Sequence, residues 1–151
     1  MDKSGSPHTK LTQLMVRAEH IALVLVLMTL AFLHTDTMAW GRFLATFVLI
    51  DLVGYLPGAI SFRLARGGKI SPVYHYLYNF AHSYLTTGFV VGVWGLTIGH
   101  LEWAMLALPI HLSSDRGLFG NTYKPASLPF EVGTHWTNVP RSIVEASKEH
   151  R

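Results

Sequence analysis

The chain has 151 residues, of which half are hydrophobic and only 14% are charged, and it contains no cysteine. Soluble domains carry about 25% charged residues, so this composition and the positive mean hydropathy favour an integral membrane protein of one domain. The lack of cysteine excludes disulfides, thiolate metal sites and cysteine nucleophiles. The net charge of +3 comes from basic residues scattered between apolar segments, so we expect no nucleic-acid binding.

Four apolar segments follow a polar N-terminal tail, residues 1–17. Each reaches the roughly 20 residues that a helix needs to cross the hydrocarbon core of a bilayer. We therefore expect an all-α integral membrane protein with a four-transmembrane-helix bundle over residues 18–116, although the first or last helix could lie along the membrane surface. The segments are residues 18–36, 39–60, 73–98 and 100–115.

The first segment has an alternative interpretation as a cleaved signal peptide. Lys3, Lys10 and Arg17 precede its apolar core IALVLVLMTLAFL, and the nearby TMA resembles a cleavage site. We expect the segment to remain in the protein as a helix.

Basic residues fall at alternate ends of the four segments, which predicts the orientation. With the N-terminus in the cytoplasm, nearly all of them lie inside, whereas the outer turns HTDTMAWGR and GHLE carry a single arginine. The C-terminal tail, residues 117–151, is then also cytoplasmic. The inside residues are Lys3, Lys10, Arg17, Arg63, Arg66, Lys69, Arg116 and Lys124.

Three of the four predicted helices bring polar side chains to the same depth, near the cytoplasmic leaflet. Ionisable groups inside a bilayer are costly, so they usually face a bundle interior and mark a site. No comparable group falls near the opposite leaflet, which argues against a conduit through the membrane. The residues are Asp51 in the second segment, His75, Asn79 and His82 in the third, and His111 and Asp115 in the fourth.

Two different faces are predicted on the third helix. At about 100° per residue, His75, Asn79 and His82 share one face. The other face carries glycines at a spacing typical of close helix packing, and Gly54 and Gly58 repeat this spacing on the second helix. The glycines of the third helix are Gly88, Gly92, Gly95 and Gly99.

His111 and Asp115 are four residues apart and project from one side of the fourth helix. An aspartate in the last turn faces the negative end of the helix dipole, so a cation should compensate it. That cation could be a metal ion, Arg63 or Arg66, or a protonated His111. Alternatively, Asp115 simply caps the next turn.

Several motifs together are similar to a known family. They are Asp51 with the nearby GYLPG, YNFAHS at 78–83, HLSSDRGLFGNTYK at 111–124 and LPFEVGTH at 128–135. In this order they resemble a family of small bacterial inner-membrane proteins filed as domain of unknown function 4260. The resemblance implies a shared fold, a shared polar cluster and the bacterial inner membrane as location, and it implies no reaction.

These residue types predict a metal site formed by His82, His111 and Asp115, with His135 of the C-terminal tail as a further ligand. Imidazole and carboxylate ligands suit zinc, iron or manganese, and an open position on the ion would activate water. We expect a metal-dependent enzyme of hydrolase or oxidase type that acts on a lipid-like substrate, with Asp115 and His111 as catalytic residues. The supporting residues are Asp51, Asn79 and Arg116, and the tail, with Glu131 and His135, could cap the cluster.

The alternative is a non-enzymatic accessory subunit. In that case the polar residues only hydrogen-bond across helices, at about 0.6 to 2 kcal/mol for each contact. The glycine faces formed by Gly54, Gly58, Gly88 and Gly92 would then dock on a second copy or on a larger membrane complex.

Overall fold

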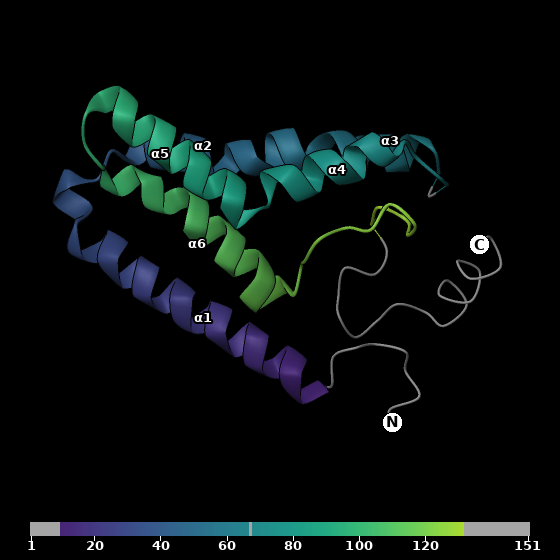
Figure 1. Ribbon diagram of the computed structural model, residues 1–151, viewed down its shortest axis with the longest axis horizontal. Helices are drawn as coiled ribbons and strands as arrows, with labels where there is room; N and C mark the ends of the chain where they lie inside the picture. The colour runs from purple at the N-terminus through teal and green to yellow at the C-terminus, as the bar shows by residue number, and fades with distance from the viewer. Residues whose placement is uncertain (1–9, 67, 132–151) are drawn as a thin grey trace.

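The computed structural model describes residues 10–66 and 68–131, and this part of the chain is helical without any strand (Figure 1). The expectation of an all-α protein is confirmed for these residues. The helices are α1 (Lys10–Leu33), η1 (Thr35–Thr37), α2 (Trp40–Gly54), α3 (Leu56–Leu64), α4 (Pro72–Ala81), α5 (Tyr84–Ile98), η2 (Trp103–Leu106), α6 (Ala107–Ser114) and η3 (Asp115–Phe119).

Two helices of the described chain are long and apolar enough to cross a membrane. One is Leu11–Leu33 within α1, and the other is Trp40–Leu64, which joins α2 and α3. Only 11% and 28% of their apolar windows are buried, so few of these residues contribute to a protein core. α1 begins at Lys10, earlier than the predicted start at residue 18, and its first turns are held to η3 because Arg17 donates to the carbonyl oxygens of Gly117 and Leu118 at 3.1 Å.

The third predicted helix is divided into α4 and α5 by a break at His82 and Ser83. The Ser83 hydroxyl accepts a hydrogen bond from the backbone N–H of Leu85 at 3.2 Å and so caps α5, as a serine does at a helix N-terminus. Consequently His82 stands at the C-terminal end of α4. The predicted polar face therefore ends at His82, and the glycine face belongs to a separate helix.

α6 occupies the middle of the molecule, between α1 on one side and α2 and α5 on the other (Figure 1). It is short and almost entirely buried, and the five residues after it, Asp115–Phe119, form a single π-helical turn. Because α2, the end of α4 and α6 converge, their polar residues are brought together in the interior.

Residues 120–131 leave η3 and return along α3 and α4 (Figure 1). Phe130 is fully buried against Ala59, Phe62 and Tyr78. A Cβ at Gly58 would clash with the Phe130 ring, so the glycine makes room for it. We call residues 120–131 the strap.

Candidate metal centre

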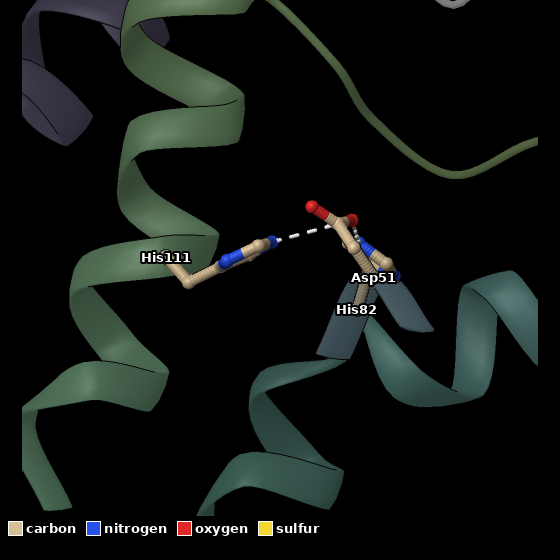
Figure 2. Close-up of side chains that lie close together, drawn as sticks. All are labelled: Asp51, His82 and His111. Carbon is tan, nitrogen blue, oxygen red and sulfur yellow. Dashed lines mark hydrogen bonds and ion pairs between the residues drawn. The ribbon is translucent and has the colours of Figure 1, made fainter. Parts of the chain in front are cut away.

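Four side chains from three parts of the fold meet beside α6. Asp51 comes from α2, His82 from the end of α4, and His111 and Asp115 from α6 and the turn that follows. Figure 2 shows that Asp51, His82 and His111 point toward one another. Both imidazoles are 5% exposed, whereas the side chains of Asp51 and Asp115 are 52% and 17% exposed. The centre is thus buried on its histidine side and open on its carboxylate side.

Each imidazole Nε2 lies close to both carboxylates. Nε2 of His82 is 3.2 Å from Asp51 Oδ1 and 3.5 Å from Asp115 Oδ2. Nε2 of His111 is 3.6 Å from Asp51 Oδ1 and 3.8 Å from Asp115 Oδ2. Asp51 Oδ1 and the two Nε2 atoms therefore surround a common point, and Asp115 Oδ2 lies near both nitrogens.

The hydrogen bond of His82 Nδ1 determines what its Nε2 presents to the centre. Nδ1 lies 3.0 Å from the carbonyl oxygen of Tyr78, which can only accept, so Nδ1 carries a proton. In a neutral imidazole, Nε2 then directs its lone pair at Asp51. A lone pair facing a carboxylate is repulsive, so the 3.2 Å contact needs either a proton shared between Nε2 and the carboxyl group or a metal ion bound by both. A histidine whose other nitrogen donates to a backbone carbonyl is the common arrangement of metal ligands.

His111 is less well satisfied than His82. Neither of its ring nitrogens has a hydrogen-bond partner within the described part of the chain, although both are buried. Phe47 packs edge-on against its ring at 4.7 Å and holds it toward the centre. An unpaired buried polar atom costs about 1 to 3 kcal/mol, and a metal ion at the common point would remove that cost.

The spacing of three ligand atoms suits a metal ion. Bonds of about 2.0 to 2.2 Å hold neighbouring ligand atoms of a tetrahedral site about 3.3 to 3.6 Å apart. Asp51 Oδ1 lies 3.2 Å from Nε2 of His82 and 3.6 Å from Nε2 of His111. The ligand atoms of Asp51, His82 and His111 all lie within 4.8 Å of one another, so these three residues could hold a metal ion. Asp51, predicted as a supporting residue, thus lies at the centre itself.

A small cavity of about 10 Å³ adjoins the centre on the side of η3. This volume is close to the minimum that one water molecule needs. His82, Asp115 and Arg116 line it together with Tyr78, Leu112, Asn121 and Thr122. The side chain of Asn121 hydrogen-bonds to Asp115. Asp115 therefore faces both the imidazoles and a space for water.

Arg116 holds the end of α4 in place. Its Nη2 donates to the carbonyl oxygen of His82 at 3.2 Å. The guanidinium carbon lies 4.5 Å from the centre of the Tyr84 ring and 5.3 Å from that of Tyr123. Tyr84 is itself fixed by a hydrogen bond of 2.6 Å between its hydroxyl and that of Ser113.

Asn79 does not join the centre. Its Nδ2 donates to the carbonyl oxygen of Lys124 at 3.0 Å, and its Oδ1 accepts from the Lys124 backbone N–H at 2.6 Å. Asn79 therefore holds the strap to α4, and its predicted supporting role beside the histidines stays a prediction. His135 lies outside the described residues.

The strap has two further attachments. Lys124 Nζ donates to the carbonyl oxygen of Phe130 at 2.7 Å and lies over the rings of Tyr78 and Phe130. His75 Nε2 donates to the carbonyl oxygen of Leu128 at 3.0 Å, so this buried histidine attaches the strap to α4. Burial lowers the pKa of Lys124 to about 8, while Glu131 and Asp115 act in the opposite direction.

Four of the six glycines predicted for helix packing, Gly54, Gly58, Gly88 and Gly92, divide into two pairs. A Cβ at Gly54 would lie 2.6 Å from Cβ of Ala81 and 3.0 Å from the His82 ring, so α2 approaches α4 closely at the metal centre. Gly58 faces Phe130, as described above. In contrast, Gly88 and Gly92 on α5 have no neighbouring atom within 4 Å of such a Cβ in the described structure.

Sequence reasoning missed three aromatic residues that shape the centre. Tyr78 stacks on His82 with ring centroids 4.0 Å apart and supplies the carbonyl that orients it. Its position four residues before His82 on one helix was the available signal. Phe47 and Tyr84 gave no such signal, because they reach the site from other helices.

Comparison with known proteins supplies no relative. No family model, no curated protein and no solved structure matches the chain.

Proposed function

We propose that the protein is a membrane-embedded, metal-dependent hydrolase that acts on a lipid-like substrate. The observation that carries the proposal is the pair of buried imidazoles whose Nε2 atoms face two carboxylates at 3.2 to 3.8 Å, one of them without any hydrogen-bond partner among the described residues. Asp51, His82 and His111 would hold zinc, iron or manganese.

Asp115 is the candidate general base. It lines the cavity that has room for one water, and its carboxylate is close to both imidazoles. A divalent ion lowers the pKa of a bound water and polarises the bond to be broken. Asp115 would accept the proton of that water, and the cavity favours hydrolysis over oxidation because it provides a water position.

The membrane setting is part of the proposal. Two helices pass the length and composition test for a membrane span, and their apolar windows are largely unburied. In the proposed arrangement the shorter helices α4, α5 and α6 complete a four-helix membrane domain in a bacterial inner membrane. Both chain ends lie in the cytoplasm, as the distribution of basic residues predicts.

Elemental analysis tests the metal. Detergent-solubilised protein should contain close to one equivalent of zinc, iron or manganese, and His111→Ala and Asp51→Asn should lose it. His34→Ala is the matched control, because His34 stacks on Trp103 at the opposite end of the fold. A wild-type protein that stays metal-free after incubation with each ion, at normal thermal stability, would refute the proposal.

Hydrolysis of p-nitrophenyl decanoate and of bis(p-nitrophenyl) phosphate in mixed micelles tests the reaction. Asp115→Asn should keep the metal and lose roughly 10²-fold or more in rate, the contribution typical of a general base. Equal rates for the wild type and Asp115→Asn would exclude Asp115 as the base.

A second candidate, an accessory subunit, is favoured by one observation. Gly88 and Gly92 leave an open strip on α5 of the kind that lets helices approach closely. Gly92→Leu should then abolish co-purification with a fixed partner while the metal content is unchanged.

A further inference from the structure

The lining of the cavity includes a cation that the metal chemistry does not use. Arg116 lines the same cavity as His82 and Asp115. A guanidinium has five N–H donors, and one nitrogen of Arg116 donates to the His82 carbonyl. None of the ion pairs between described residues includes Arg116. Its charge is therefore not matched by a carboxylate there.

Neighbouring groups hold the guanidinium in position. Its carbon lies 4.5 Å from the centre of the Tyr84 ring, and Tyr84 is fixed by the 2.6 Å hydrogen bond to Ser113. A guanidinium that packs on a ring with its face keeps its edge, where the N–H groups are, available to an anion. A preorganised edge beside a metal centre is the geometry of oxyanion recognition.

Charge balance also favours an anionic ligand at Arg116. A divalent ion would neutralise the carboxylates of Asp51 and Asp115, which leaves the positive charge of Arg116 beside a neutral centre. A substrate with an anionic group would balance that charge, whereas an uncharged ester would not. A tetrahedral phosphate has enough oxygens to bind the metal with one and accept from Arg116 with another, which a planar carboxylate does less readily.

Exposed apolar side chains follow this cation on the same π-helical turn. Leu118 and Phe119, two and three residues after Arg116 on η3, are 52% and 59% exposed. They could contact the acyl chains of a lipid whose phosphate binds Arg116 at the edge of the cavity. Extending the metal-dependent hydrolase proposed above, we propose that Arg116 forms a phosphate subsite beside the metal centre and that the substrate is a lipid phosphate ester.

Isothermal titration calorimetry on the zinc-loaded full chain in a neutral detergent tests this subsite. The probes are dihexanoyl phosphatidic acid, dihexanoylglycerol and inorganic phosphate. Phosphatidic acid should bind at least about tenfold more tightly than dihexanoylglycerol, and Arg116→Gln should lose that preference, as expected for a lost charge-assisted hydrogen bond. Arg66→Gln, which removes an exposed arginine in the turn after α3, is the charge-matched control and should bind as the wild type does.

A structural role for Arg116 at the end of α4 predicts a different result. In that case Arg116→Gln would lower metal content or thermal stability and leave the ratio between the two lipids unchanged, which would overturn the subsite. If Arg116→Gln does not fold, Arg116→Lys is measured instead. Lysine keeps the positive charge but lacks the planar guanidinium that can bind a phosphate through two N–H groups. The Arg116→Lys protein should therefore still prefer phosphatidic acid and bind it at least about threefold more weakly than the wild type. Binding equal to that of the wild type would overturn the subsite.

Two further results distinguish a soluble phosphate from a lipid phosphate, and a failure of the subsite from a failure of the hydrolase. Inorganic phosphate that binds as tightly as phosphatidic acid would support the anion subsite and assign it to a soluble phosphate. Metal content is measured on the same samples, so a protein that binds no metal refutes the hydrolase, whereas a metal-loaded protein without a phosphate preference refutes only the subsite.

Discussion

The two ends of the helical assembly treat their polar residues differently. At the end formed by η1 and η2, Arg42 donates to both carboxylate oxygens of Glu102 at 2.8 and 2.7 Å. His34 is also satisfied there, because its Nδ1 lies 2.9 Å from the Leu30 carbonyl oxygen and its ring stacks on Trp103 at 3.6 Å. At the other end, His111 is buried and neither of its ring nitrogens has a hydrogen bond among the described residues, although its Nε2 lies 3.6 Å from Asp51 Oδ1 and 3.8 Å from Asp115 Oδ2.

The difference supports the proposal that the cluster around His111 is the functional one. The polar groups at the end formed by η1 and η2 are accounted for by hydrogen bonds and ring contacts within the protein. Buried imidazoles that face carboxylates without a full set of hydrogen bonds are instead candidates for a ligand site. The following experiments would break or sharpen this contrast.

Removal of the metal should have the largest effect. A bound ion at a free concentration of 100 times its Kd stabilises the folded state by about 2.7 kcal/mol, so a chelator should lower the melting temperature of the wild type. The chelator should have no such effect on His111→Ala, whereas His34→Ala should respond as the wild type does. Equal responses of His111→Ala and His34→Ala would remove the distinction between the two ends.

Gly54→Ala should have the second largest effect on stability and metal binding. The added methyl group would press on Ala81 and on the His82 ring, and overpacking of this kind costs about 1 to 3 kcal/mol. Both the melting temperature and the metal affinity should fall, as measured by thermal denaturation and zinc titration. Gly92→Ala is the control, because its site is open and alanine is favoured over glycine in a helix by about 0.5 to 1 kcal/mol. A Gly54→Ala protein with unchanged zinc affinity would contradict the close contact.

The strap predicts a pH dependence of stability. Burial lowers the pKa of Lys124 to about 8 in the folded protein, whereas an unfolded lysine has a pKa of about 10.4. Between these values the unfolded chain binds more protons, so the free energy of unfolding should rise with pH from about 8 to about 10.4. Melting curves of Lys124→Met should lack this rise. Parallel pH profiles for the two proteins would show that Lys124 stays charged throughout.

Arg42→Ala should have the smallest effect. The Arg42 side chain is 63% exposed, and exposed ion pairs contribute about 0.2 to 1 kcal/mol. Stability should fall within that range at low salt and less at high salt, with no change in metal content. A loss of metal in this variant would show that the two ends of the fold are coupled.

Much of the metal centre was predictable from the sequence. Ionisable residues are rare in apolar segments, so Asp51, His82, His111 and Asp115 stood out, and a common orientation of the helices put them at one depth. The helical class followed from the same apolar segments and is confirmed for the described residues. The positions of Gly54 and Gly58 were found as well, although their neighbours were not.

The break between α4 and α5 and the role of Asn79 were not predictable. A continuous apolar segment gives no sign of a break at Ser83, and the partner of Asn79 is Lys124, which is 45 residues away. Spacing along one helix reports which residues share a face, and it does not report what arrives from elsewhere to cover that face.

The sequence by itself determined that this protein is helical and apolar and that several histidines and aspartates lie at a similar depth along its predicted helices. Only the tertiary structure decided that Asp51 contacts both imidazoles, that Asn79 holds the strap, and that Arg116, beside the cavity, forms no ion pair with a carboxylate of residues 10–66 and 68–131. The physical reason is that residue type and period are local properties of the chain. The pairing of a buried lone pair or charge depends instead on atoms that distant helices bring to within a few ångströms.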